Sequence, residues 1–462
     1  MAANPGVSSH HISEAALQLA AEKSYEYLRA VESRNVAAKP SALAALEQFH
    51  ESFPDGPSDA ASVVAMLDKL GSPATVTTTG GRYFGYVNGA TLPASLAASW
   101  LANTWDQNAA LRAMSPVAAE LEEVVLRWVC EALGLPRGCE GGLVTCATMA
   151  NFTALCTARH ALLARMGWNV GEDGMFGAPP IQMVVGQEVH ASILKALKLA
   201  GFGSKRVTTV EADGQGRMRA DKLPRLDKNT IVCIQAGNVN IGSFDPAREI
   251  CERAHEQGAW VHVDGAFGLW AAASPKHRHL VAGFELADSW GTDAHKWPNI
   301  SYDSGIVLVR DGVALRAAMT VSAAYLQPGT RREPMHHTPE SSRRARGVEL
   351  WAGLKSLGRR GLADLIERTC GHAQRFAAGL REAGFEILND VVINQVLVSF
   401  GSPEKTLEVI RRIQQDGTCW CGETVWQGKT AMRISVSSWA TTESDVEKSL
   451  EAMIRIARET GV

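Results

Sequence analysis

The sequence has no long apolar run and no excess of charge of one sign. No stretch approaches the roughly 18 consecutive apolar residues that are needed to cross a bilayer. The 46 basic and 49 acidic residues give a formal net charge of −3, and no basic run stands out. We therefore expect neither a membrane nor a nucleic acid as a partner.

A secretory signal and a disulfide framework are also missing. The N-terminus, MAANPGVSSHH, has no charged segment followed by an apolar core. The nine cysteines are an odd number and are scattered along the chain. Cys419 and Cys421 form one close pair, but no His/Cys pair at ligand spacing accompanies them. We expect free thiols in a reducing, cytoplasmic compartment, and no metal site.

The chain divides into four segments of different pattern. Residues 1–70 show apolar residues at helical spacing, and residues 71–325 alternate apolar strands with helices. Residues 326–344 are rich in Pro, Gly and charge, which is typical of a mobile lid. Residues 345–462 begin with a long helix and end with a strand and a helix. This pattern predicts an N-terminal helical segment, a large domain, a mobile loop and a small domain.

The large domain carries the clearest strand pattern. Near-continuous apolar strands are predicted at residues 181–185, 207–210, 230–234, 260–263 and 305–309. Strands of this kind, separated by helices, indicate a mainly parallel sheet that is covered on both faces. Ligands bind beyond the carboxyl ends of the strands in such sheets, so the polar residues at those ends are candidate site residues.

Asp264 directly follows the strand at residues 260–263. An unpaired buried carboxylate is costly, so its position needs a reason. One interpretation is a helix cap or a partner for a nearby arginine. The other is a carboxylate that pairs with a protonated ring nitrogen, which makes a pyridinium ring an electron sink.

Lys296 lies in an apolar and aromatic stretch, 32 positions after Asp264, with Trp290 before it and Trp297 after it. A lysine that snorkels to the surface is the ordinary interpretation, but it fits this stretch poorly. Burial disfavours the ammonium form and leaves the amine as a nucleophile for a carbonyl group.

Two weaker signals accompany these residues. Residues 142–151 are small and hydroxyl-bearing and lead into a helix, whose first N–H groups attract a phosphate. An ordinary capped helix explains them equally well. His190 follows the strand at residues 181–185 and is placed to lie flat on an aromatic ring, although a lone histidine is more often structural.

Taken in order, these four sites resemble the group II amino-acid decarboxylases, which are fold-type-I enzymes dependent on pyridoxal 5′-phosphate. The most specific matches are residues 262–266 (HVDGA) and 293–297 (DAHKW). The resemblance covers most of the chain. It implies an α/β fold, with a mainly parallel seven-stranded sheet in the large domain and a smaller α+β domain at the C-terminus.

The resemblance also implies roles at the matching positions. Lys296 would hold the cofactor as a Schiff base, and Asp264 would pair with its ring nitrogen. The other cofactor-binding positions are His190 and Ala266 on the two ring faces, Ala147, Thr148 and His295 at the phosphate, and Asn238 nearby. Arg433 matches a small-domain arginine near the substrate carboxylate, although a surface strand arginine is an equal alternative. Tyr86 is expected beside the substrate.

Two departures from the family pattern bear on the chemistry. Asp293 stands where many members have asparagine, and its charge would repel a phosphate. We therefore expect Asp293 to point elsewhere and Thr292 to serve instead. The loop also lacks the tyrosine that returns a proton in the family's decarboxylases. His336 and His337 stand there, so His337 is the candidate catalytic acid, unless both histidines are simply solvated.

These features predict a lyase that decarboxylates an L-amino acid to an amine and carbon dioxide. Tyr83, Phe84, Tyr86 and Trp105 favour an aromatic or apolar substrate, although all four could be core residues. Without the loop tyrosine, an aldehyde synthase or a carbon–carbon lyase on the same fold is the main alternative, and a cofactor-binding protein without catalysis is a third. The resemblance further implies a homodimer with sites at its two-fold interface.

Overall fold

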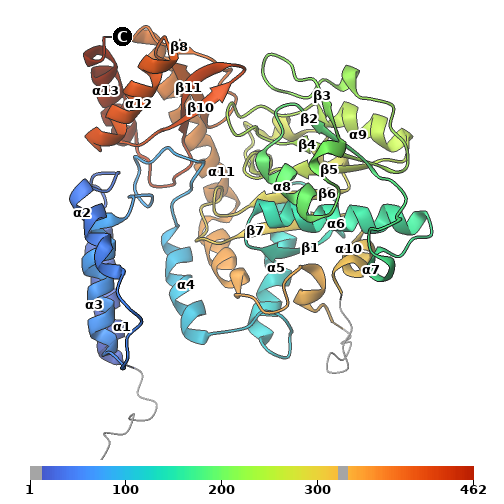
Figure 1. Cartoon of the computed structure of the whole chain (residues 1–462), viewed down its shortest axis with the longest axis horizontal. Coiled ribbons are helices and arrows are strands. Elements are labelled where there is room, and N and C mark those ends of the chain that lie inside the picture. Colours follow the sequence, from blue (N-terminus) through green and yellow to red (C-terminus); the bar gives the residue numbers. More distant parts are fainter. Residues whose placement is uncertain (1–12, 321–330, 462) are drawn as a thin grey trace, which may run out of the picture.

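The computed structural model describes residues 13–320 and 331–461. Figure 1 shows a helical arm, a large domain built on one sheet, and a small domain that contains the C-terminus. The arm consists of α1 (Glu14–Ala30), α2 (Pro40–Ala45) and α3 (Ala60–Gly71). Helix α1 has 17 residues and none of them is buried within the chain. The arm therefore has little packing of its own.

The large sheet has seven strands, as predicted. Their order is β1 (Glu140–Val144), β7 (Gly305–Val309), β6 (Ser289–Asp293), β5 (Trp260–Asp264), β4 (Thr230–Gln235), β2 (Gln182–Gly186) and β3 (Val207–Val210). Only β7 runs antiparallel to its neighbours, so the sheet is mainly parallel. The five strands predicted from apolar runs are confirmed. Strands β1 and β6 contain glycine and polar residues and therefore lack that signal.

Helices cover both faces of the sheet. One face carries α6 (Ala147–Arg165), α8 (Ala191–Leu199) and α10 (Gly312–Met319), and the other carries α5 (Pro116–Ala132) and α9 (Ala247–Glu256). Along β5, Trp260 belongs to the α6 face, whereas Val261 and Val263 belong to the other. Because side chains alternate along a strand, His262 and Asp264 point to the α6 face.

A second, antiparallel sheet forms the small domain. Its order is β10 (Gly422–Trp426), β11 (Lys429–Ser435), β9 (Gln395–Ser399) and β8 (Glu386–Ile387), with α12 (Pro403–Asp416) and α13 (Glu443–Glu459) packed beside it. Helix α11 (Arg346–Glu382) contacts both domains, and its helical dihedrals are interrupted at Gly358 with φ 60°. Two further helices are α4 (Pro93–Trp105) and α7 (Val170–Asp173).

The mobility predicted for residues 326–344 stays a prediction, and the described part of this segment makes buried contacts. Residues 326–330 lie outside the described residues, but residues 331–344 are anchored to the large domain. Arg343 and Arg332 both bind the buried carboxylate of Glu122, at 2.6 and 2.8 Å. A short 3₁₀ turn, Pro334–His337, buries His337 at 2% exposure. Charged residues suggested a solvated loop, but here they form buried ion pairs.

We predict that Glu122→Ala lowers the thermal stability strongly, because it leaves the guanidinium of Arg343 buried without its partner. Breaking a buried pair in this way costs about 3–5 kcal/mol. The matched control is Glu120→Ala, which removes an exposed carboxylate that pairs with Arg112 and Arg331, and its cost should stay below about 0.5 kcal/mol. Equal changes of Tm in the two variants, measured by calorimetry, would show that Glu122 does not anchor the segment.

Candidate functional site

Lys296 lies just beyond the end of β6. Its amine is 3.0 Å from Oδ2 of Asp293, and its side chain is 17% exposed. The other oxygen of Asp293 accepts a hydrogen bond from the backbone N–H of Ala147 at 2.6 Å. Since Ala147 is the first residue of α6, Asp293 brings Lys296 and the start of that helix together. Asp293 therefore faces the site, contrary to the expectation that it points away.

Asp264 ends the neighbouring strand, β5, and pairs in register with Gly291 of β6. Its carboxylate accepts hydrogen bonds from the backbone N–H of Ala266 and from the hydroxyl of Ser192, both at 3.2 Å. Both partners are neutral groups. Asp264 is 4% exposed, so the site holds a buried negative charge that is not used in an ion pair among the described residues.

His190 is the N-cap of α8, and its Nδ1 lies 2.8 Å from the hydroxyl of Ser192. Burial lowers the pKa of His190; the negative charge of Asp264 opposes this, and the positive charges of Lys296 and Arg433 add to it. The charges of Asp264, Lys296 and Arg433 thus all act on the imidazole of His190. A neutral imidazole is suited to lie against an aromatic ring.

The start of α6 offers hydrogen-bond donors to an anion. Its N-cap, Cys146, makes no side-chain cap bond, so Cys146 leaves the N–H groups of the first turn open to other acceptors. The amide of Ala147 already donates to Asp293, which leaves the amide and hydroxyl of Thr148. His295 lies close by: its Nε2 is 3.5 Å from Asp293, and its ring stacks on Tyr302 at 4.3 Å.

Two predicted cofactor residues, Thr292 and Asn238, make hydrogen bonds to the backbone, and their contact with the cofactor stays a prediction. The hydroxyl of Thr292 donates to the carbonyl oxygen of Gly265 at 2.8 Å. The amide of Asn238 donates to the carbonyl oxygen of Glu188 at 3.2 Å, and its side-chain oxygen accepts from the N–H of Asn240 at 2.9 Å. Thr292 thus shapes the turn after Asp264, and Asn238 ties its loop to the segment that leads to His190.

Arg433 on β11 extends the site into the small domain. Its guanidinium donates to the carbonyl oxygen of Val239 and to Oδ1 of Asn240, both at 3.4 Å. Burial lowers the pKa of Arg433, while the nearby phenols of Tyr86 and Tyr83 act in the opposite direction. Its hydrogen-bond partners are neutral oxygens, so the charge remains available to an anionic ligand. Arg433 is half-buried and hydrogen-bonded to the loop that follows β4, which does not fit the alternative of a simple surface arginine.

Aromatic rings surround Arg433. Trp420 stacks on Tyr83 at 5.1 Å and lies 5.5 Å from the ring of Tyr86, which is 65% exposed. Phe84 is fully buried against Phe376 and belongs to the small-domain core. Trp105 lies at the far end of α4. Tyr83 and Tyr86 are therefore near the site, whereas Phe84 is not, and Trp420 was not recognised from the sequence.

His337 lies apart from these residues. Its Nδ1 is 3.1 Å from the carbonyl oxygen of Glu333, and its Nε2 is 3.0 Å from Oε2 of Glu140. Glu140 and Ser289 both pair with Val309 of β7, so Glu140 is level with the start of β6. Ser289 is four residues, or about 13 Å, from Asp293 at the other end of that strand. His337 is therefore remote from Lys296 of its own chain, and its role as a catalytic acid stays a prediction. The adjacent His336 is half-buried.

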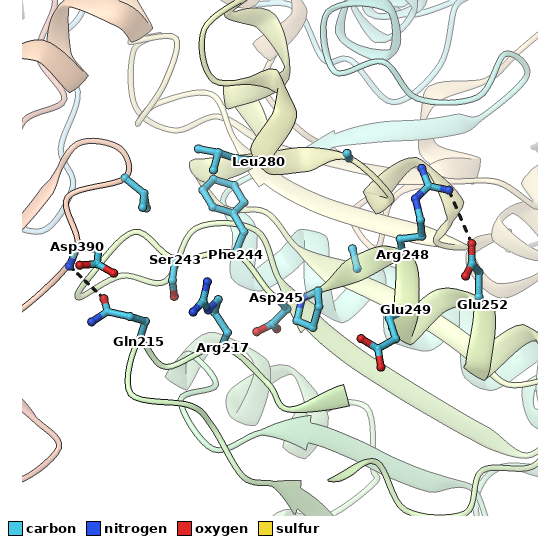
Figure 2. Close-up of a pocket in the computed structure, with 14 residues that line it drawn as sticks. Gln215, Arg217, Ser243, Phe244, Asp245, Arg248, Glu249, Glu252, Leu280 and Asp390 are labelled. Carbon is cyan, nitrogen blue, oxygen red and sulfur yellow. Dashed lines mark hydrogen bonds and ion pairs between the residues drawn. The ribbon is translucent and has the colours of Figure 1, made fainter. Parts of the chain in front are cut away.

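A pocket of about 450 Å³ lies elsewhere, beside the start of α9 (Figure 2). Of the fourteen described residues that line it, none is a lysine, histidine or cysteine. Asp245 in this pocket accepts two backbone N–H groups, from Met218 and Gln235, both at 2.7 Å. Burial raises the pKa of Asp245 to about 6. This carboxylate ties the backbone at Met218 to β4, and the described lining of the pocket offers no amine, imidazole or thiol.

The residues at the strand ends fit pyridoxal 5′-phosphate. The amine of Lys296 suits an aldehyde, the buried carboxylate of Asp264 suits a protonated ring nitrogen, and the uncapped start of α6 with Thr148 and His295 suits a phosphate. Across the described residues, no three His, Cys, Asp or Glu side chains gather as metal ligands would. Within those same ranges, no helix is both long and apolar enough to span a membrane.

Comparison with known proteins agrees with this assignment. The family model of the pyridoxal-dependent decarboxylase conserved domain matches residues 41–401. Tryptophan decarboxylase 1 of Oryza sativa subsp. japonica is 26% identical over 75% of this chain and 74% of its own length. Phenylacetaldehyde synthase of Arabidopsis thaliana is 26% identical over 72% of this chain and 73% of its own length. Some other relatives are longer, and the chain spans about half of their length.

A solved structure shows the same fold. The crystal structure of Oryza sativa TDC with PLP and tryptamine superposes with a TM-score of 0.88 at 22% identity, and the match covers 99% of both chains. This likeness extends over the arm, the large domain and the small domain.

Stability should depend on pH through His262, which is fully buried behind Asp264. Burial lowers the pKa of His262 to about 3, against the opposing effect of its contact with Ser289. Below pH of about 6.5 the unfolded chain binds a proton here that the folded chain does not. The free energy of unfolding should therefore fall on acidification, by about 1.4 kcal/mol per pH unit, until about pH 3.

We predict that His262→Gln removes this contribution, so that denaturation of the variant depends less on pH between 6.5 and 4. Urea unfolding of both proteins across that interval measures the difference. Parallel stability curves would mean that His262 is protonated equally in the two states.

Proposed function

The chain belongs to the pyridoxal-dependent decarboxylase family, and we propose that it decarboxylates an aromatic L-amino acid to the amine and carbon dioxide. Its cofactor is pyridoxal 5′-phosphate. The observation that carries the proposal is that Lys296 and Asp264 lie at the ends of the neighbouring strands β6 and β5, while Arg433 binds the loop that follows β4. The aromatic rings beside Arg433 support the substrate class.

We assign each cofactor contact to a group with matching chemistry. The bound cofactor supplies an electron sink for the electron pair that is left when a bond at Cα breaks. Lys296 holds it covalently, and Asp264 keeps its ring nitrogen protonated. His190 and Ala266 lie against the two ring faces. At the phosphate, the donors are Thr148 and His295, with Ala147 in close contact.

Arg433 and the aromatic cluster orient the substrate. The guanidinium of Arg433 binds a carboxylate, which is its usual planar partner. The rings of Tyr86 and Trp420 lie against the substrate side chain, since offset and edge contacts between aromatic rings are favourable. These contacts fix the direction of the Cα–carboxylate bond.

A proton must return to Cα after carbon dioxide leaves. The position of His337 does not support that role in its own chain. Lys296 carries a basic amine within the same site, and its partner Asp293 at 3.0 Å accepts a hydrogen bond from it. We assign this proton to Nζ of Lys296.

An aldehyde synthase is the second candidate. The loop contains no tyrosine between residues 331 and 344, and a relative that is 26% identical is named phenylacetaldehyde synthase. Such a reaction consumes oxygen and releases ammonia and peroxide besides carbon dioxide. The substrate would be the same amino acid, so only the products separate the two candidates.

We further propose a homodimer. Leu17 on α1, Leu67 on α3 and Leu101 on α4 are each more than half exposed, and α1 buries no residue within the chain. These exposed leucines of the arm and of α4 need a partner surface to cover them. A second copy of the chain supplies one by two-fold symmetry. Sedimentation equilibrium distinguishes the dimer from a monomer.

The thiols fit a cytoplasmic location, which we also propose. All nine cysteines are free, and six of them are buried. Thiols in this state persist in a reducing compartment.

The direct test is a panel of L-amino acids with the purified holoenzyme, in which carbon dioxide, amine, aldehyde and peroxide are measured together. We expect amine in equal amount to carbon dioxide, with phenylalanine, tyrosine or tryptophan preferred over glutamate. Arg433→Gln should raise KM more than it lowers kcat, because it removes substrate binding. Aldehyde and peroxide in place of amine would favour the second candidate. A preference for glutamate would overturn the proposed substrate class.

A further inference from the structure

A chain of buried polar side chains runs behind Asp264 on the α6 face of the sheet. It begins at the indole of Trp260 and ends at the carboxylate of Asp264. Its successive contacts are Trp260 Nε1 to Ser289 Oγ at 2.9 Å, Ser289 Oγ to His262 Nδ1 at 3.0 Å, His262 Nε2 to Asn151 Oδ1 at 3.0 Å, Asn151 Nδ2 to Ser192 Oγ at 3.5 Å, and Ser192 Oγ to Asp264 Oδ2 at 3.2 Å.

The two ends of the chain fix its direction. An indole N–H only donates, and an ionised carboxylate only accepts. The hydroxyl of Ser289 accepts from Trp260 and so donates to His262. His262 is then neutral with its hydrogen on Nε2, which donates to the side-chain oxygen of Asn151. The amide of Asn151 donates to Ser192, whose one hydroxyl hydrogen goes to Asp264. The hydroxyl oxygen of Ser192 also accepts from Nδ1 of His190, which therefore carries a hydrogen. Every donor thus meets an acceptor.

The surroundings preserve this chain. Trp260, Ser289, His262, Asn151 and Ser192 are all buried, so water does not compete for their hydrogen bonds. Gly291 on β6 makes room for Asn151, because a Cβ at that position would lie 2.4 Å from Asn151 Oδ1. Such a Cβ would displace the amide from between His262 and Ser192. The absence of a side chain at position 291 is therefore part of the arrangement.

We propose that His262, Asn151 and Ser192 are positioning residues that hold the carboxylate of Asp264 in place for the ring nitrogen of pyridoxal phosphate. Ser192 has a second task, since its hydroxyl also lies 2.8 Å from Nδ1 of His190. One hydroxyl thereby links the group that faces the ring nitrogen to the group that lies on the ring face. This inference rests on the proposed role of Asp264.

The test is the affinity of the apoprotein for pyridoxal phosphate, measured by quenching of tryptophan fluorescence. Ser192→Ala removes the last donor, and Gly291→Ala displaces Asn151 without removing any hydrogen-bonding group. Loss of a hydrogen bond to a charged group predicts a Kd that rises about tenfold to a hundredfold in both variants. The pH dependence of the visible absorbance of the bound cofactor should also shift. Ser192→Thr keeps the hydroxyl, so its Kd and the pH dependence of its visible absorbance should match those of the wild type.

Thr157→Val is the matched control. It also removes a buried hydroxyl from the same helix as Asn151. That hydroxyl donates to the backbone of Thr153 and is not part of the hydrogen-bond series that leads to Asp264. Its Kd should stay within about twofold of the wild type, and calorimetry of each apoprotein reports any general loss of stability. An unchanged Kd in Ser192→Ala would overturn the proposal, and so would equal weakening in Thr157→Val.

The readout needs no turnover, so it separates this inference from the proposed reaction. A wild-type protein that binds the cofactor but decarboxylates no amino acid would refute the proposed function. The Kd comparison would still show whether the hydrogen-bond series behind Asp264 supports cofactor binding. If Gly291→Ala does not fold, Ser192→Ala decides alone, because it lies in the first turn of α8 and removes only one oxygen atom.

Discussion

The pairing of β5 with β6 is the constraint on which the site depends. Its register sets Asp264 beside Gly291, and two residues later Asp293 ends β6, with Lys296 just beyond. A slip by one residue would turn Asp264 to the opposite face of the sheet and separate it from Ser192 and His190. The register is held by apolar side chains such as Val263 and Trp290, which pair with one another on the face covered by α5 and α9. The chemistry at the strand ends is thus set by packing in the core.

Other elements are placed relative to these two strand ends. Asp293 accepts from the first amide of α6, so a single carboxylate joins the lysine to the helix start that we propose as the phosphate site. Arg433 reaches the same site from the small domain through its contacts with Val239 and Asn240. The site therefore forms only when both domains are folded against one another. Its charges, two acidic and two basic, lie where water is largely excluded, which strengthens their effect on a ligand.

Much of this arrangement could be predicted from the sequence, where local patterns decide the structure. Five apolar strands of the sheet follow directly from their residues, and Asp264 and Lys296 stand out because charge is rare in such surroundings. Strands β1 and β6 escaped prediction because glycine and polar residues interrupt them, and it is their pairing with neighbouring strands that makes them strands.

Long-range contacts explain the remaining differences. Asp293 faces the site because Lys296 and the amide of Ala147 together stabilise its charge, which no local pattern reveals. His337 pairs with Glu140, 197 positions away in the sequence, and Arg343 with Glu122, 221 positions away. Asn151 and Ser192 were visible beside the predicted sites, but their link to Asp264 exists only in the folded chain.

The covalent attachment of the cofactor at Lys296 tests the central claim most directly. Borohydride reduction of the holoenzyme, followed by digestion and mass spectrometry, should abolish the visible absorbance and leave the reduced cofactor's mass on the peptide that contains Lys296. Lys276→Ala, which removes an exposed lysine, should leave the label unchanged, and Lys296→Ala should lose it. A label on any other lysine of the wild-type protein, or no bound cofactor, would contradict the account.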